Sequence, residues 1–297
     1  MSELLIDFRI KTPLRDDESS PEVPLPDGMK RYGELYGMKQ LLNIPFDRLV
    51  ADLERHHIRG ILQTEFEDGA NPRPLNERTA ELLERRPDLF YGGLATADPR
   101  EPDALDELIY AHDVLGLRGF IFQPAFLRMR PTDRALYPLY EFCQERQVPV
   151  TIHTGVNFSD SAPFDFGRPV WIDYVACDFP DLTLVANHGS FPWVMEAAAL
   201  AWRHSNVYLE FGAIAPKYLA HDKGGYQPIT HWMRTQLQDK ILLGTDWPML
   251  QYDRLVAELP MLQLGSATEK YHVSNARTII DRVWPKHTVD EENAANG

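Results

Sequence analysis

The chain has 297 residues, of which 44% are hydrophobic, and this length and composition suit a single domain with a large core. Its net charge of −14 at pH 7 repels phosphate backbones, which excludes nucleic acid as a general partner. The first residues lack a basic segment followed by a long apolar one, and no stretch approaches 18 uncharged apolar residues, so we expect a cytoplasmic protein without a membrane span.

Short apolar runs alternate with longer amphipathic stretches along most of the chain. Eight of these runs are expected to be strands: Leu4–Phe8, Gly60–Thr64, Phe90–Ala95, Gly119–Phe122, Pro149–His153, Thr183–Asn187, Val207–Phe211 and Lys240–Gly244. Segments with a helical period separate them, for example residues 44–57 and 103–114. Eight such units close most naturally into a (β/α)8 TIM barrel, although a doubly wound open sheet has the same local pattern. We therefore predict an α/β fold with residues 1–284 as one barrel domain.

Two stretches do not fit the repeat. Residues 12–43 include the run PLRDDESSPEVPLPDG and follow the first strand, where they are too long for an ordinary loop. They are interpreted either as a lid over the mouth of the barrel or as a disordered surface insertion. Residues 285–297 lack an apolar period and are predicted to be a disordered tail. The two cysteines, Cys143 and Cys177, are expected to be buried thiols on helices rather than a disulfide.

Polar side chains end three of the expected strands. His153 in PVTIHTG ends the fifth strand, His188 in LTLVANHGS ends the sixth, and Asp246 in KILLGTDWP follows the eighth. Residues just past the carboxyl ends of barrel strands face the active site. One such histidine is as often structural as functional, but three polar residues at the same end of the barrel indicate a site.

Around these residues the chain resembles the amidohydrolase-related (amidohydrolase 2) family, whose metal-dependent-hydrolase barrels are similar to aminocarboxymuconate-semialdehyde decarboxylase. The matching blocks run almost from end to end: IDF, GLRGFIFQP, YPLYEFCQERQVPVTIHTG, VACDFPDLTLVANHG, SNVYLEFG, KILLGTDWP and SNA. The resemblance implies that His153 corresponds to a metal ligand. It also implies that His188 is an acid/base or electrostatic histidine beside the metal, and that Asp246 is a ligand that handles protons.

The chain departs from this family after the first strand. Members place H-x-H or E-x-H two residues beyond an I-D pair, but IDFRIK has Arg9 and Lys11 there. Arginine stays protonated, and a lysine would first have to lose its proton before it could bind a metal. At about 5 Å and an effective dielectric near 20, each fixed cation repels a divalent ion by roughly 6–7 kcal/mol. A metal such as Zn or Mn on His153, His188 and Asp246 therefore requires both cations to point away.

The favoured hypothesis has no metal. The side chains of Arg9 and Lys11 occupy its space, supply its positive charge, and hold a substrate carboxylate or polarise a carbonyl. Asp246 is then ion-paired with a lowered pKa, and His188 transfers the proton. Two alternatives remain for the cations. Lys11 can form a Schiff base with a keto acid, or the pair forms a structural network with aspartates.

Smaller hypotheses concern four further residues. Arg118, before the fourth strand, and Arg130, beyond it, are candidates for binding an acidic substrate, although surface arginines are the commoner case. Glu65, after the second strand, faces either the pocket or the solvent. Trp247 either lines the site with its ring or packs in the core.

Two functions follow from these observations. The first is an enzyme, a hydrolase or a decarboxylase, that acts on a small acidic or carbonyl-bearing metabolite. The second is a barrel that has lost catalysis and binds a ligand or partner. The resemblance also implies a homodimer. No cofactor is favoured, with one divalent metal as the alternative.

Overall fold

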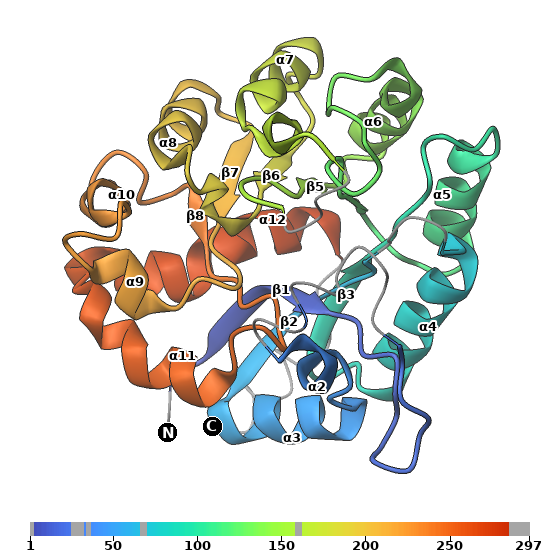
Figure 1. The fold of residues 1–297 in the computed structure, drawn as a ribbon, viewed down its shortest axis with the longest axis horizontal. Helices are drawn as coiled ribbons and strands as arrows, with labels where there is room; N and C mark the ends of the chain where they lie inside the picture. The colour runs from blue at the N-terminus through green and yellow to red at the C-terminus, as the bar shows by residue number, and fades with distance from the viewer. Residues whose placement is uncertain (1–2, 25–32, 34–36, 66–69, 158–161, 285–297) are drawn as a thin grey trace.

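The computed structural model describes residues 3–24, 33, 37–65, 70–157 and 162–284. The predicted tail and residues 25–32 and 34–36 of the predicted insertion lie outside this set. In the described part, strands occupy the centre and helices surround them (Figure 1). The strands are β1 (Leu5–Lys11), β2 (Ile58–Gln63), β3 (Phe90–Leu94), β4 (Phe120–Phe122), β5 (Val150–Ile152), β6 (Leu184–Ala186), β7 (Val207–Glu210) and β8 (Ile241–Leu242).

Parallel pairing joins these strands in chain order. β1, β2 and β3 form one run, and β4 to β8 form a second. A bridge between Ala95 and Phe120 connects the two runs, and a bridge between Ile10 and Trp247 returns the segment after β8 to β1. Every expected strand overlaps an observed one, so the predicted (β/α)8 barrel is confirmed.

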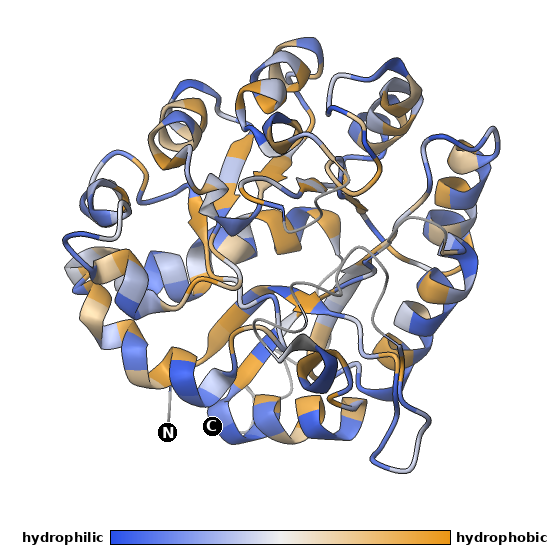
Figure 2. Cartoon of the chain, viewed as in Figure 1, coloured by the Kyte–Doolittle hydropathy of each residue, from blue (hydrophilic) through white to orange (hydrophobic). Residues whose placement is uncertain are grey.

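The helices that cover this barrel follow the expected order. They are α2 (Met38–Leu42), α3 (Phe46–His56), α4 (Pro72–Arg85), α5 (Ala104–Asp113), α6 (Tyr137–Glu145), α7 (Val170–Asp178), α8 (Val194–Arg203), α9 (Pro216–Ala220), α10 (Gln227–Met233), α11 (Tyr252–Glu258) and α12 (Asn275–Val283). Hydrophobic residues gather on the strands and on the inward helix faces, while hydrophilic residues lie outward (Figure 2). In α3 the inward stripe is Phe46, Leu49 and Leu53, spaced as one face of a helix requires.

The described part of the insertion is held in place by polar contacts. The guanidinium of Arg15 donates to the carbonyl oxygens of Asn43 at 2.6 Å and Ser20 at 3.0 Å. The side chain of Asn43 bonds both the N–H and the carbonyl of Val23, at 2.7 and 3.0 Å. Arg78 of α4 donates to Asp16 at 2.8 Å. These contacts fix the segment before α2 against the barrel's helices.

The cysteines differ in exposure. Cys143 is buried in α6, as expected, and burial raises the pKa of its thiol. Cys177 is exposed on α7, so the expectation of two buried thiols was wrong for this residue. Its side chain projects from the outer surface of the helix, which the apolar residues around it in the sequence did not reveal. Among the described residues, no helix is long and apolar enough to cross a membrane.

Candidate active site

Charged and imidazole side chains meet where the strands end. β1 supplies Arg9 and Lys11, and the segments at or after the carboxyl ends of five other strands supply one further residue each. We call this group the strand-end cluster; it consists of Arg9, Lys11, Glu65, His153, His188, Glu210 and Asp246. Barrel topology explains the gathering, because parallel strands bring their carboxyl ends to the same face.

Arg9 is at the centre of the cluster, and its side chain is only 1% exposed. Its Nε donates to Oδ1 of Asp246 at 2.9 Å, and its Nη1 to Oε1 of Gln63 at 3.1 Å. Its Nη2 donates to Oε1 of Glu65 at 2.6 Å, and Lys11 forms an ion pair with the same carboxylate. Although burial opposes its charge, the carboxylates of Asp246 and Glu65 hold the pKa of Arg9 above its ordinary value. The guanidinium thus stays charged, and each of its nitrogens has a partner.

The two carboxylates that Arg9 contacts differ in their proton affinity. Burial opposes the charge of Glu65, but Lys11 and Arg9 together hold its pKa below the ordinary value. Burial raises the pKa of Asp246, and the neighbouring charge of Glu65 raises it further, against the effect of Arg9. The expectation that ion pairing lowers the pKa of Asp246 was therefore wrong, because burial outweighs the pair. Asp246 is a stronger base than an exposed aspartate.

Glu210, at the end of β7, was not among the predicted site residues. It is completely buried, and its Oε2 lies 4.0 Å from Nε of Arg9 without a hydrogen-bond partner in the described structure. Burial raises its pKa to about 8, so it carries a proton at neutral pH. A Cβ on Gly212 or Gly244 would clash with its Oε1, so both glycines make room for it. A charged residue inside an apolar strand, in VYLEFG, was the available signal.

The two histidines face each other, with ring centroids 4.6 Å apart. Nδ1 of His188 lies 2.9 Å from the carbonyl oxygen of Gly212, which can only accept, so Nδ1 carries the hydrogen. Nε2 of His188 and Nε2 of His153 are buried, and neither has a hydrogen-bond partner in the described structure. Burial, and then the charge of Arg9, lowers the pKa of His153 to about 4 and that of His188 well below its ordinary value. Both rings are therefore neutral at pH 7.

The remaining predicted residues have different positions. Glu65 belongs to the cluster, although solvent exposure seemed the commoner outcome from sequence. Trp247 is 1% exposed and packs in the core. Arg130 is at the surface, 3.5 Å from Asp165 and over aromatic rings. Arg118 precedes β4 and so lies at the end of the barrel opposite the cluster, which corrects its assignment to substrate binding.

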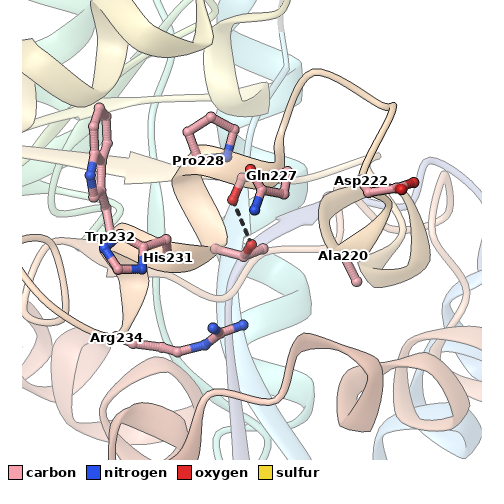
Figure 3. A pocket seen from close by; sticks show the side chains of 8 residues that line it. Ala220, Asp222, Gln227, Pro228, His231, Trp232 and Arg234 are labelled. Atoms are coloured by element: carbon pink, nitrogen blue, oxygen red, sulfur yellow. Dashed lines mark hydrogen bonds between the residues drawn. The ribbon is translucent and has the colours of Figure 1, made fainter.

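A hollow of about 500 Å³ lies apart from the cluster, at the end of α9 and along α10 (Figure 3). Trp232, His231 and Arg234 are among the side chains that line it, and the hydroxyl of Thr230 donates to the carbonyl oxygen of Gln227 at 2.8 Å. None of its lining residues belongs to the strand-end cluster.

The amidohydrolase family model matches residues 26–280, and the chain belongs to this family. The enzyme of amidohydrolase type expected from the sequence is confirmed by this match. The uncharacterized TIM-barrel protein Bb4693 of Bordetella bronchiseptica is 26% identical, with a TM-score of 0.76 over 94% of this chain and 99% of that one.

More distant structures share the fold. The 5-carboxyvanillate decarboxylase LigW of Sphingomonas paucimobilis is 14% identical, with a TM-score of 0.70 over 94% of this chain and 99% of that one. A dihydroxybenzoic acid decarboxylase of Polaromonas sp. JS666, with bound manganese and 2-nitroresorcinol, is 15% identical, with a TM-score of 0.68 over 94% and 97%. A stretch of 68 residues is 31% identical to protein fluG of Emericella nidulans, but it spans only 8% of that protein and 23% of this chain.

The family resemblance implies a divalent metal, and the cluster does not fit one. The guanidinium of Arg9 donates directly to Asp246, one of the implied ligands. Across the described residues, one set of three His, Cys, Asp or Glu side chains has its ligand atoms within 4.8 Å of one another, and its members are Asp173, Cys177 and His204. That set is part of a surface ion-pair network, in which Asp173 lies 2.6 Å from His204. His153, His188 and Asp246 do not converge in this way.

Proposed function

We propose that the protein is an amidohydrolase-family hydrolase that acts on a small carbonyl compound and uses the guanidinium of Arg9 where its relatives use a metal. The observation that carries this proposal is the 2.9 Å hydrogen bond from Arg9 to Asp246. A fixed cation then holds the carboxylate that the family resemblance assigns to metal binding and proton transfer. Preorganised charge of this kind needs no rearrangement during the reaction.

Charge balance favours hydrolysis over decarboxylation. Arg9 and Lys11 carry two positive charges, and the ionised forms of Glu65 and Asp246 carry two negative charges at close range. Decarboxylation leaves a carbanion or enolate that requires a cation without a partner nearby. Hydrolysis instead requires a base, a donor for the oxyanion and an oriented water, and the cluster offers each of these.

In the proposed reaction Asp246 takes a proton from water while the water oxygen forms a bond to the carbonyl carbon. The lone pair on Nε2 of His188 accepts a hydrogen bond from the second O–H group of this water and orients it. Lys11 donates to the oxyanion that develops on the carbonyl oxygen. The intermediate then breaks its bond to the leaving group, which takes the proton from Asp246.

Decarboxylation is the second candidate, because two structural neighbours are named as decarboxylases of small aromatic acids. A decarboxylase would act on a small acidic substrate, as the sequence analysis expects, and Lys11 would bind its carboxylate. The two candidates are separated by product. Hydrolysis of phenyl acetate, dihydrocoumarin or benzamide releases an acid, whereas 2,6-dihydroxybenzoate releases carbon dioxide.

The test begins with these compounds and the Asp246→Asn variant. Loss of a general base lowers kcat by about 10²–10⁴-fold, and we expect KM to change little. Asp253→Asn is the matched control, because Asp253 is 61% exposed on α11 outside the cluster. Undiminished turnover by Asp246→Asn would contradict the proposed role. Absence of turnover of every compound, with binding retained, would favour the inactive barrel.

Metal content is the second arm of the test. Purified protein is dialysed against a chelator, its Zn, Mn and Fe are measured per chain, and the turnover is measured again. We expect unchanged turnover, and we expect the Arg9→His, Lys11→His double variant to gain metal. Near-stoichiometric metal in the native chain, with turnover lost on its removal, would overturn the substitution by Arg9.

A further inference from the structure

A cavity of about 150 Å³ lies between the insertion and the barrel, next to the strand-end cluster. Lys11 and Glu65 line one part of it, so it reaches the cluster at the ion pair between these residues. The side chain of Lys11 is 16% exposed and that of Glu65 9%, which makes Lys11 more accessible than Arg9. A molecule in the cavity therefore meets the cluster at the ammonium of Lys11.

Most of the other described residues of the wall are apolar. Leu14 and Val23 come from the insertion, Leu42 from the end of α2, and Leu75 from α4. An apolar cavity of about this size accommodates benzene in a protein interior. The volume and the lining thus match a group the size of one hydrocarbon ring.

Two threonines also line the cavity, but their hydroxyls do not make its wall polar. The hydroxyls of Thr12 and Thr64 both lie within hydrogen-bond distance of the hydroxyl of Thr79, at 2.8 and 2.5 Å. Thr12 also donates to the carbonyl oxygen of Gln63, at 3.2 Å. Because these hydroxyls satisfy one another and the backbone, they offer a ligand little polar attraction.

Polar contacts hold the described residues on the insertion side of the cavity in place. The side chain of Asn43 bonds the backbone of Val23, and the side chain of Arg15, the residue after Leu14, donates to the carbonyl oxygen of Asn43. A wall that is already in place loses little conformational entropy when a ligand binds. The described residues of the insertion that line the cavity therefore form a fixed side of it.

We propose that this cavity binds the hydrocarbon group of the substrate, the size of one ring, and that it places a neutral carbonyl oxygen at Lys11. This inference rests on the proposed function, because it names the substrate class for the same site. The charge of Glu65 decides in favour of a neutral oxygen. Its carboxylate neutralises Lys11 and would repel a second carboxylate, whereas the polar N–H groups of Lys11 still donate to a carbonyl.

Binding of two neutral amides to the whole protein tests the proposal without any turnover. Benzamide and acetamide share the carbonyl group and differ in the ring, and their dissociation constants are measured by ligand-observed NMR titration. We expect benzamide to bind at least tenfold more tightly than acetamide. Benzoate, which carries a charge, is expected to bind more weakly than benzamide.

Substitutions at Leu75 locate the ring. Leu75→Phe fills the cavity and is expected to reduce the affinity for benzamide at least fivefold while acetamide is unaffected. Leu75→Ala enlarges the cavity and is expected to raise the affinity for 2-naphthamide relative to benzamide. Val114→Phe is the matched control, because Val114 is 67% exposed after α5. Thermal midpoints establish that each variant is folded.

The outcomes separate this proposal from the proposed function. Equal affinity for benzamide and acetamide would overturn the cavity proposal, and so would a preference for benzamide that both Leu75 variants leave unchanged. Tighter binding of benzoate than of benzamide would overturn the neutral-oxygen part. If the binding results are as expected but no carbonyl compound is hydrolysed, the cavity proposal stands and the hydrolase proposal fails.

Discussion

Replacing Arg9 by methionine tests whether this buried cation holds the strand-end cluster together. The native guanidinium contacts both Glu65 and Asp246. In Arg9→Met, Glu65 keeps Lys11 as a partner, but Asp246 loses the cation that holds it. Removing one partner of a buried ion pair typically destabilises a protein by about 3–5 kcal/mol, and we expect a loss of this size at pH 7.

The pH dependence of this loss is a stricter test than its size. Without Arg9 the pKa of Asp246 rises further above its unfolded value of 3.8, because burial is no longer opposed by the guanidinium. The folded variant then binds more protons than the unfolded chain, so its stability falls as pH rises above about 4. The destabilisation of Arg9→Met should therefore be smaller at pH 5.5 than at pH 8.

The free energy of unfolding is measured by urea titration at pH 5.5 and pH 8 for the native chain, Arg9→Met and Lys11→Met. Lys11→Met is the control, because Glu65 retains Arg9 and Lys11 is partly exposed, so a smaller loss is expected. If the slope of the free energy of unfolding against urea concentration is unchanged, the variant differs from the native chain in stability alone. The reasoning is refuted if Arg9→Met costs less than about 1 kcal/mol, or if its cost does not grow with pH.

Two further predictions concern buried titratable groups. Glu210 has a folded pKa of about 8 against an ordinary value of 4.5, so the stability of the native protein should fall by a few kcal/mol, roughly, between these pH values. Glu210→Gln should lack this fall in denaturant titrations from pH 5 to 9, and an identical pH profile would show that Glu210 is ionised in the folded state. Of the two cysteines, Cys177 should react rapidly with a thiol reagent and Cys143 only after unfolding. Two rapid thiols, or none, in the folded protein would contradict their placement.

The fold could be predicted because apolar runs and helical periods repeat along the whole chain. The strand bounds were less accurate. The last strand was expected over residues 240–244, but β8 pairs only over Ile241 and Leu242. Leu243 is buried in the core just beyond β8, where its carbonyl oxygen accepts a hydrogen bond from the N–H of Phe8 in β1 at 2.9 Å. Sequence indicates burial, and pairing depends on the geometry of the closed barrel.

The sequence predicted which residues form the site better than it predicted their protonation states. His153, His188 and Asp246 follow from their places at strand ends, and Arg9 and Lys11 stand where the family resemblance places H-x-H. The structure brings all five together. Their protonation depends on burial, which outweighs ion pairing at Asp246 and lowers the pKa of both histidines. These side chains are buried by residues from strands that are distant in sequence. The residues adjacent to each of them along the chain therefore do not reveal how deeply it is buried.

Glu210 shows how the missing information affects the chemistry. With Glu210 protonated, the charges of Arg9 and Lys11 are matched by those of Glu65 and Asp246 alone. An ionised Glu210 would add a third carboxylate 4.0 Å from Arg9 and weaken the pull of the guanidinium on Asp246. The basicity of Asp246 therefore depends on a neighbour that never has to touch the substrate. A guanidinium can hold such a carboxylate in position, but the proton transfer must come from the cluster's own acids and bases.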